Sequence, residues 1–326
     1  MTRNRFPLFF NAFFICILFS LLISCAGEKE KSTIPVIGFL DAFEDETLSK
    51  ARLGFFDALS EKGFSEANKN IKVIYRNAQG DIPTLVQACD YFISEKVDLI
   101  ATNTTISTIT AVQKTKDIPV CMMVAPSPQL AGLVDKNGKS PSNLFGVFET
   151  LSYIDTSVAL IQVLYPGIKK LGLIYNAAEP QSQSAYQQIQ AQCKIMGMEL
   201  SAQSVSNSSE TQLVVESLIN QGIQVFFAMP DNSVFASFES ITAACAKAKI
   251  PVFTSEAGLV ARGAVAAFGA DMYLWGYQSG VQAANFLANQ KSALPQLEMV
   301  KVRSRILNKK VANTLSLKAD STFTIF

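Results

Sequence analysis

The segment Val36-Ile37-Gly38-Phe39-Leu40-Asp41 opens a series of short apolar runs that alternate with amphipathic segments. A short apolar run with polar residues at its ends is typical of a buried strand. Runs of this kind separated by amphipathic helices predict βα units around a parallel sheet. We therefore expect strands at 36–40, 71–75, 99–102 and 120–124, with helices at 48–62, 84–95 and 107–114 between them.

A second series of the same kind begins at Leu171-Gly172-Leu173-Ile174-Tyr175-Asn176, whose pattern matches that of the first segment. It predicts strands at 171–175, 199–205, 225–229 and 252–254, and helices at 182–196, 211–220 and 234–247. Gene duplication would explain the match, although two independent sets of βα units could also look alike. In either case we expect an α/β protein with two doubly wound parallel-sheet lobes. Ligands of such sheets bind beyond the carboxyl ends of the strands, so two facing lobes predict a ligand-binding cleft.

The first 24 residues have the features of a secretory signal peptide. Arg3 and Arg5 precede an almost uninterrupted apolar run, and Leu22-Ile23-Ser24-Cys25 is similar to the bacterial lipobox. We expect residues 1–24 to be removed, Cys25 to carry a lipid and residues 25–33 to form a tether. The rest of the chain would then lie outside the cytoplasm, anchored to a bacterial membrane by acyl chains. A plain membrane-spanning helix is the alternative, because the apolar run approaches the length that spans a bilayer.

The composition argues against several classes of function. The 28 basic and 27 acidic residues nearly cancel, so the chain lacks the basic charge typical of nucleic-acid binding. The absence of histidine removes Ser-His-Asp and Cys-His catalysis and the commonest ligand of transition metals. The chain also has no nucleotide-binding P-loop motif. We expect no catalytic residue, no metal and no cofactor.

Four cysteines lie in apolar periodic segments without the spacing of metal ligands: Cys89, Cys121, Cys193 and Cys245. We interpret them as small buried apolar side chains, with a disulfide as the alternative.

Six short motifs follow one another in a recognisable order: Tyr75-Arg76-Asn77-Ala78-Gln79-Gly80-Asp81, Lys116-Asp117-Ile118-Pro119, Ala131-Gly132-Leu133-Val134, Tyr175-Asn176-Ala177-Ala178-Glu179, Asp231-Asn232 and Arg262-Gly263-Ala264. In this order the chain resembles the ABC-transporter substrate-binding proteins of the tryptophan/tyrosine/phenylalanine-binding type. The resemblance covers nearly all of the chain after the signal. It implies a type I periplasmic-binding-protein fold, in which two Rossmann-like lobes are joined by a hinge of three crossovers.

The resemblance also implies where the chain passes between the lobes. We place the crossovers near Phe148, Ala261 and Lys291. The N-terminal lobe would then comprise residues 34–147 and 262–291, and the C-terminal lobe residues 148–261 and 292–326. A helix at 273–289 would return to the N-terminal lobe.

In the N-terminal lobe, polar residues follow two of the expected strands. Asp41 starts the acidic stretch 41–46, which either pairs with a ligand ammonium or only stabilises the start of the next helix. Thr105 and Ser107 lie at a helix start, where hydroxyls and free backbone N–H groups suit a carboxylate. Thr105 matches the threonine of a Thr-Pro-Ala-Ala turn in the family, although Ile106 replaces the proline. Ordinary helix capping is the alternative, and a cap can also bind an anion.

In the C-terminal lobe, the resemblance points to residues after two strands. Glu179-Pro180-Gln181-Ser182 matches the family's Glu-Ala-Asn-Ser segment, with departures at Pro180 and Gln181, and Ser182 would cap the helix that begins there and contact the ligand. Asn176 belongs to the motif that ends at Glu179. Asp231 and Asn232 match a Thr-Asp-Asn turn, and we expect Asp231 to bind the α-ammonium group of the ligand. Capping of the following helix is the alternative role of Asp231.

Two further positions depart from the family in ways that bear on specificity. Ser127 replaces a frequent aspartate, and Glu256 replaces the aspartate of a Ser-Asp-Thr turn. An aromatic ligand also needs a flat apolar slot. The aromatic residues that we expect near strand ends or crossovers are Phe43, Phe148, Tyr175 and Tyr273, whereas Trp275 is expected to pack.

The resemblance implies a solute-binding protein that captures a small zwitterionic ligand, an aromatic amino acid, by hinge closure. It would deliver tryptophan, phenylalanine or tyrosine to an ABC permease powered by a separate ATPase, and we expect it to act as a monomer. A sensor that reports to a membrane receptor, or an importer of another small ligand, would use the same fold. An enzyme would need a nucleophile with a base, and a DNA-binding regulator would need a basic helix-turn-helix, and we find neither.

Overall fold

The computed structural model describes residues 34–289, 293–317 and 321–326. The expected signal peptide, the lipidated Cys25 and the tether lie outside these residues. Residues Pro35–Phe326 form one compact unit. Within the described residues, no helix combines the length and the apolar character that a bilayer crossing requires.

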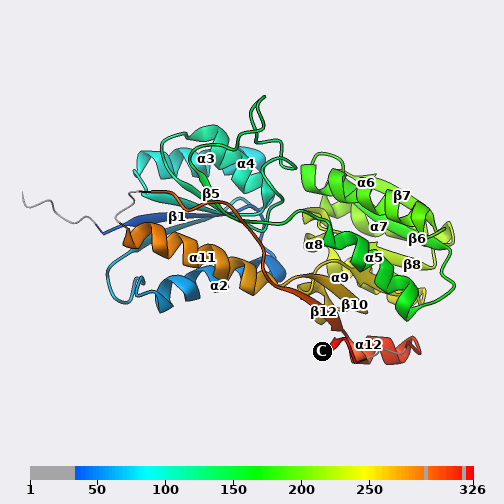
Figure 1. The fold of residues 1–326 in the computed structure, drawn as a ribbon. Helices are drawn as coiled ribbons and strands as arrows, with labels where there is room; N and C mark the ends of the chain where they lie inside the picture. Colours follow the sequence, from blue (N-terminus) through cyan, green and yellow to red (C-terminus); the bar gives the residue numbers. More distant parts are fainter. Residues whose placement is uncertain (1–33, 290–292, 318–320) are drawn as a thin grey trace, which may run out of the picture. The chain divides into compact units, whose positions relative to one another are not determined.

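The N-terminal lobe is built on a sheet with the strand order β11-β5-β4-β3-β1-β2, and every neighbouring pair in it is parallel. Alternating residues of β1 face opposite sides of this sheet: Ile37 and Phe39 join one apolar cluster, and Leu40 joins another. Helices α2 and α11 cover the first side, and α3 and α4 cover the second (Figure 1). The elements of this lobe are β1 Val36–Asp41, α2 Glu46–Glu61, β2 Lys72–Asn77, α3 Ile82–Ser94, β3 Leu99–Asn103, α4 Thr105–Lys114, β4 Val120–Met123, β5 Leu144–Phe148, α11 Met272–Ala288 and β11 Glu298–Met299.

The C-terminal lobe is built on a second sheet with the order β13-β12-β10-β9-β8-β6-β7. Its neighbours are parallel except for β10 and β12, so the sheet is mostly parallel, as expected. Helices α5 and α6 cover one face, and α7 and α9 cover the other (Figure 1). Its elements are α5 Tyr153–Leu164, β6 Lys170–Asn176, α6 Pro180–Ile195, β7 Glu199–Val205, η1 Ser208–Glu210, α7 Thr211–Asn220, β8 Val225–Ala228, α8 Asn232–Ala236, α9 Phe238–Lys247, β9 Val252–Thr254, α10 Gly258–Ala261, β10 Ala266–Ala270, β12 Arg303–Leu307, α12 Lys309–Thr314 and β13 Thr324–Ile325.

Two glycines allow α11 to pack tightly against α2. A Cβ atom at Gly54 would lie 2.0 Å from the Tyr273 carbonyl oxygen, and one at Gly276 would lie 1.8 Å from the Ala51 carbonyl oxygen. Because neither helix backbone has room for such an atom, only glycine fits at these positions. The helix expected at 273–289 therefore does return to the N-terminal lobe.

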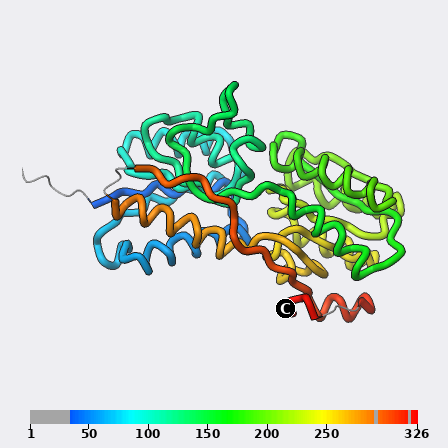
Figure 2. Tube along the Cα trace, in the orientation of Figure 1, coloured from blue at the N-terminus to red at the C-terminus, as the bar shows by residue number. Residues whose placement is uncertain are grey.

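The strand pairing corrects two of the expected crossovers. The first crossover follows β5 at Phe148, as expected, but β10 pairs with β9 and β12 and so belongs to the C-terminal lobe. The return to the N-terminal lobe consequently falls at Asp271 rather than near Ala261. The last crossover follows β11, which pairs with β5; the expected position Lys291 lies outside the described residues. Figure 2 lets the reader follow the trace from β5 into α5, from β10 into α11 and from β11 into β12.

Some elements differ from the expected ones. The helix expected at 234–247 is divided into α8 and α9 at Ser237, whose hydroxyl donates to the Ser233 carbonyl oxygen at 2.6 Å. The strands β5 and β10 and the helix α5 were not among the expected elements. β10 has the sequence Ala-Ala-Phe-Gly-Ala, and small residues have little intrinsic preference for strands.

Candidate functional site

A cavity lies where residues of both lobes meet. Thr105 and Pro126 contribute from the N-terminal lobe, and Asp231 and Glu256 contribute from the C-terminal lobe. Trp275 of α11 also lines the cavity. The lining residues mostly follow the carboxyl ends of strands, which is where open parallel sheets bind their ligands.

Asp231 is fully buried in the cavity wall just after β8. Its Oδ1 accepts a hydrogen bond from the Val234 backbone N–H at 3.0 Å and thereby caps α8. Its Oδ2 accepts from the Ser182 hydroxyl and from the Asn176 backbone N–H, both at 2.6 Å. Asp231 therefore both caps α8 and lines the cavity.

Glu179 lies next to Asp231 and is also buried. Its Oε2 accepts from the Asn232 backbone N–H at 3.2 Å and from Asn232 Nδ2 at 2.8 Å, while Asn176 Nδ2 lies 3.4 Å from its Oε1. Burial and the neighbouring Asp231 raise the pKa of Glu179 to about 8, and burial raises the pKa of Asp231. A cation bound here would relieve the cost of two adjacent buried carboxylates.

The structure brings five of the expected residues together at this point. Asp231 and Asn232 line the cavity, and Ser182 positions the Asp231 carboxylate. Glu179 and Asn176 border a second, larger groove, and they form hydrogen bonds with Asn232 and Asp231, which line the cavity.

The start of α4 is the second polar part of the site. Thr105 is its first residue, is 2% exposed and lines the cavity. The buried hydroxyls of Thr104 and Ser107 have no hydrogen-bond partner among the described residues. Thr104 has a φ of 93°, an unfavourable value for a residue with a side chain. Unsatisfied donors at a helix N-terminus favour an anion, although of these three residues only Thr105 lines the cavity.

Two glutamates complete the charged lining, and they have different partners. Glu149 follows β5 and is fully buried, and its two oxygens accept from Arg303 Nε at 2.8 Å and Nη2 at 2.7 Å. Glu256 follows β9, and its Oε1 accepts from the Tyr153 hydroxyl at 2.9 Å. Burial raises the pKa of Glu256 to about 8. The departure from the family noted at Glu256 therefore lies in the cavity wall.

The aromatic residues of the cavity are not those expected. Tyr153, Phe235 and Trp275 line it, and Trp275 also donates from Nε1 to the Val147 carbonyl oxygen at 2.9 Å. The expected set, Phe43, Phe148, Tyr175 and Tyr273, is not part of this lining, and Phe43 borders only the neighbouring groove. Tyr175 stacks on Tyr186 with ring centres 4.5 Å apart, and the Tyr273 hydroxyl donates to Asp57.

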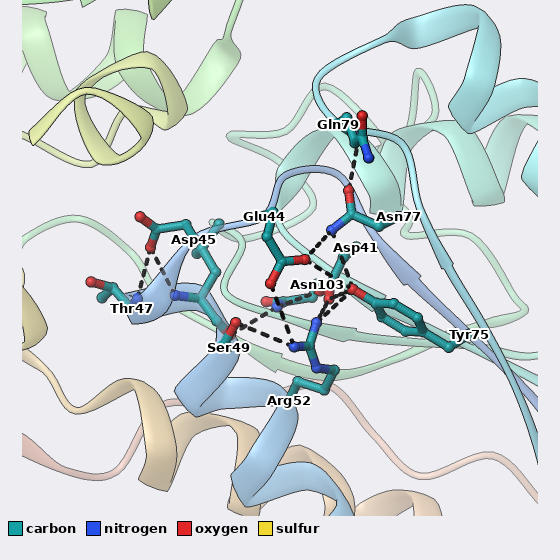
Figure 3. Close-up of polar contacts among 11 residues, drawn as sticks. Asp41, Glu44, Asp45, Thr47, Ser49, Arg52, Tyr75, Asn77, Gln79 and Asn103 are labelled. Atoms are coloured by element: carbon teal, nitrogen blue, oxygen red, sulfur yellow. Dashed lines mark hydrogen bonds and ion pairs between the residues drawn. The ribbon is translucent and has the colours of Figure 1, made fainter.

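Asp41 and Ser127 also lie outside the cavity lining. The Asp41 carboxylate forms an ion pair with Arg52 and accepts hydrogen bonds from Asn103 at 2.8 Å and from the Tyr75 hydroxyl at 2.9 Å, as Figure 3 shows. Because Asp41 lies outside the cavity lining and its charge is already paired with Arg52, it is not placed to bind a ligand ammonium. Ser127 is half-buried, and its hydroxyl lies 3.4 Å from the Leu130 backbone N–H, which indicates a role in the local turn.

The four cysteines are free and buried, in agreement with their interpretation as small apolar side chains. Among the described residues, no group of three or more Cys, Asp or Glu side chains is arranged to hold a metal ion.

Comparison with known proteins gives a consistent result. The family described as ABC transporter substrate binding protein matches residues 36–323. A tyrosine-binding protein of Clostridioides difficile (strain R20291) is 35% identical over 261 residues, which are 80% of this chain and 74% of that protein.

Solved structures share the fold over almost the whole chain. An ABC domain in complex with L-Trp from Streptococcus pneumonia has a TM-score of 0.82 at 22% identity, with 90% of this chain and 99% of that chain covered. A ligand-free, open substrate binding protein with adhesive properties from Clostridium difficile has a TM-score of 0.66 at 28% identity, with the same coverage. The fold is thus the type I fold implied by the resemblance, and the chain belongs to the ABC transporter substrate binding protein family.

Proposed function

We propose that this chain captures an aromatic amino acid in the cavity between its lobes and delivers it to an ABC permease outside the cytoplasm. A separate ATPase would supply the energy of transport. The observation that carries the proposal is the composition of one cavity wall: Asp231, the start of α4 and three aromatic residues.

Each part of a zwitterionic aromatic ligand has a counterpart in this wall. Asp231, with Glu179 beside it, would bind the α-ammonium group. The start of α4, with Thr105 and Ser107, would bind the α-carboxylate through hydroxyls and backbone N–H groups. Tyr153, Phe235 and Trp275 would pack against the ring; aromatic contacts contribute about 0.5 to 1.5 kcal/mol beyond burial.

The named ligands of similar proteins support this ligand class. The curated relative is a tyrosine-binding protein, and a structure of the same fold contains L-Trp. A micromolar dissociation constant corresponds to about 8 kcal/mol, which an ammonium site, a carboxylate site and a buried ring can supply together.

Closure of the lobes would hold the ligand. A ligand that contacts both lobes stabilises the closed state over the open one by its differential affinity. We also propose that the chain is exported, is anchored through a lipid on Cys25 and acts as a monomer. Export and the lipid anchor rest on the sequence of the N-terminal segment, which lies outside the described residues, and the monomer is what we expect of a binding protein of this class.

A thermal-shift screen tests the ligand class. The chain from Ala26 onward would be unfolded and refolded to remove any bound ligand and then heated with each of the twenty amino acids, and with purines, sugars and short peptides. A ligand at a hundredfold excess over Kd raises stability by about 2.7 kcal/mol. A selective rise with tryptophan, tyrosine or phenylalanine is expected. A rise with another class alone would contradict the aromatic assignment while leaving the family intact.

A further inference from the structure

One carboxylate oxygen in the cavity wall has no partner. Glu256 is 1% exposed and lines the cavity. Its Oε1 accepts from the Tyr153 hydroxyl at 2.9 Å and lies 3.3 Å from the Ser255 hydroxyl, whereas its Oε2 has no hydrogen-bond partner among the described residues. A buried polar atom without a partner is costly, and in a cavity wall it points to a ligand atom that would satisfy it.

In the other carboxylates of the lining, each oxygen already accepts at least one hydrogen bond. A carboxylate has about four acceptor positions, so Asp231 can still receive a hydrogen of the ligand ammonium. Both oxygens of Glu149 accept from Arg303, and both oxygens of Asp231 accept hydrogen bonds from their own lobe. Glu256 is therefore the lining carboxylate with one oxygen that has no partner among the described residues.

Glu256 and the expected ammonium site have different charged neighbours. Asp231 raises the pKa of Glu179, whereas Glu149 raises the pKa of Glu256. The acidic lining thus consists of two parts, Asp231 after β8 and the pair of Glu149 and Glu256 after β5 and β9. If the α-ammonium group occupies the first part and the α-carboxylate lies at the start of α4, the second part is left for the ligand's side chain.

We propose that Glu256 is a specificity-determining residue, whose Oε2 accepts a hydrogen bond from a polar hydrogen on the aromatic side chain of the ligand. This inference rests on the proposed function. The hydrogen is the phenol O–H of tyrosine or the indole N–H of tryptophan, and phenylalanine has no equivalent. Burial raises the pKa of Glu256 to about 8 in the empty protein, so Oε2 accepts this hydrogen once the carboxyl group has lost its own proton. A site that is built to bond a polar hydrogen discriminates against the analogue that lacks it, because the buried acceptor is then left unpaired.

The test compares three ligands and three forms of the full chain after its signal. Dissociation constants for L-tyrosine, L-tryptophan and L-phenylalanine would be measured for the wild type, Glu256→Met and Ser255→Ala. Glu256→Met replaces the carboxylate with an apolar side chain of similar length. Ser255→Ala is the matched control, because its hydroxyl touches the same carboxylate but Ser255 does not line the cavity.

We expect the wild type to bind tyrosine or tryptophan at least tenfold more tightly than phenylalanine. In Glu256→Met, the affinities for tyrosine and tryptophan should come within about threefold of the affinity for phenylalanine, which should stay the same. Ser255→Ala should keep the wild-type preference. An equal loss for all three ligands would overturn the proposal and assign Glu256 to the ammonium group instead. A wild type that binds the three equally would also overturn it, with the proposed function intact. A wild type that binds none would overturn both. The melting temperature of each ligand-free variant reports whether it folds.

Discussion

The Arg262 guanidinium of the C-terminal lobe lies 2.7 Å from the Asp45 carboxylate of the N-terminal lobe. Both side chains are almost completely buried, and Arg262 also donates to the Thr47 hydroxyl at 3.0 Å. Within its own lobe, Arg262 binds Glu239 and the carbonyl oxygen of Phe235, a residue of the cavity wall. Arg262 thus contacts both the N-terminal lobe and a residue that lines the cavity.

Loss of this contact should weaken ligand binding. Asp45→Asn keeps an oxygen to cap α2 but removes the ion pair with Arg262. If the contact stabilises only the closed state by about 1 kcal/mol, the Kd should rise about fivefold. Titration calorimetry would measure this change, with Glu46→Gln as the control, because Glu46 is exposed on the same helix turn. Equal affinities in Asp45→Asn and the control would mean that the contact does not favour closure.

The stability of the ligand-free protein should fall as the pH rises from about 5 to about 8. Burial raises the pKa of Glu256 and Glu179 from 4.5 to about 8, with Asp231 adding to the effect at Glu179. The folded state therefore binds these protons more tightly than the unfolded state does. The free energy that this proton binding adds to folding is lost as the pH rises over this interval. Melting temperatures of the refolded protein across the interval would show the decline, and a combined Glu179→Gln and Glu256→Gln variant should flatten it. A melting temperature that rises with pH in the wild type would show that these carboxyl groups are already ionised when empty.

Replacement of Asp231 should abolish binding without unfolding the protein. Asp231→Asn keeps the cap on α8 but removes the charge, so we expect the Kd for an aromatic amino acid to rise at least a hundredfold. The melting temperature of the empty protein should stay within a few degrees of the wild type. Asp81→Asn is the matched control, because Asp81 caps α3 through the Thr84 backbone N–H but does not line the cavity. Unchanged affinity in Asp231→Asn would remove it from the ammonium site.

The hydroxyl of Thr105 should contribute to carboxylate binding. Thr105→Val preserves the shape of the side chain, and we expect a loss of affinity of about tenfold, the equivalent of about 1.4 kcal/mol. Thr110→Val is the control on the same helix, because the Thr110 hydroxyl donates to the Ile106 carbonyl oxygen at 2.8 Å within that helix. Calorimetric titrations that give the same Kd for both variants would place the carboxylate elsewhere.

Much of the fold could be predicted because its signals are local. β1 was expected at 36–40 and spans Val36–Asp41, and the helix expected at 211–220 is α7. β10 was missed because its small residues have little preference for strands, and its strand character comes from pairing with β9 and β12. Because of the same pairing, the chain returns to the N-terminal lobe at Asp271 and not near Ala261, the position expected from the sequence.

The candidate site was predicted in part, because some of its residues are marked by local sequence features. Asp231 and Thr105 lie shortly after strands, so the rule for parallel sheets placed them at the cleft, and the family resemblance singled out Asp231. Asp41 also follows a strand, but Arg52 reaches its carboxylate from α2, and no sequence pattern indicates that pairing. Phe235 and Tyr153 were missed because their place in the wall depends on how α8 and α5 pack.

The most direct test of the proposed function is a calorimetric titration of the refolded, ligand-free protein with L-tyrosine, L-tryptophan and L-phenylalanine. The proposed function predicts one ligand per chain and a micromolar or tighter Kd for at least one of the three, equivalent to about 8 kcal/mol. The absence of binding for all three at millimolar concentration would contradict it.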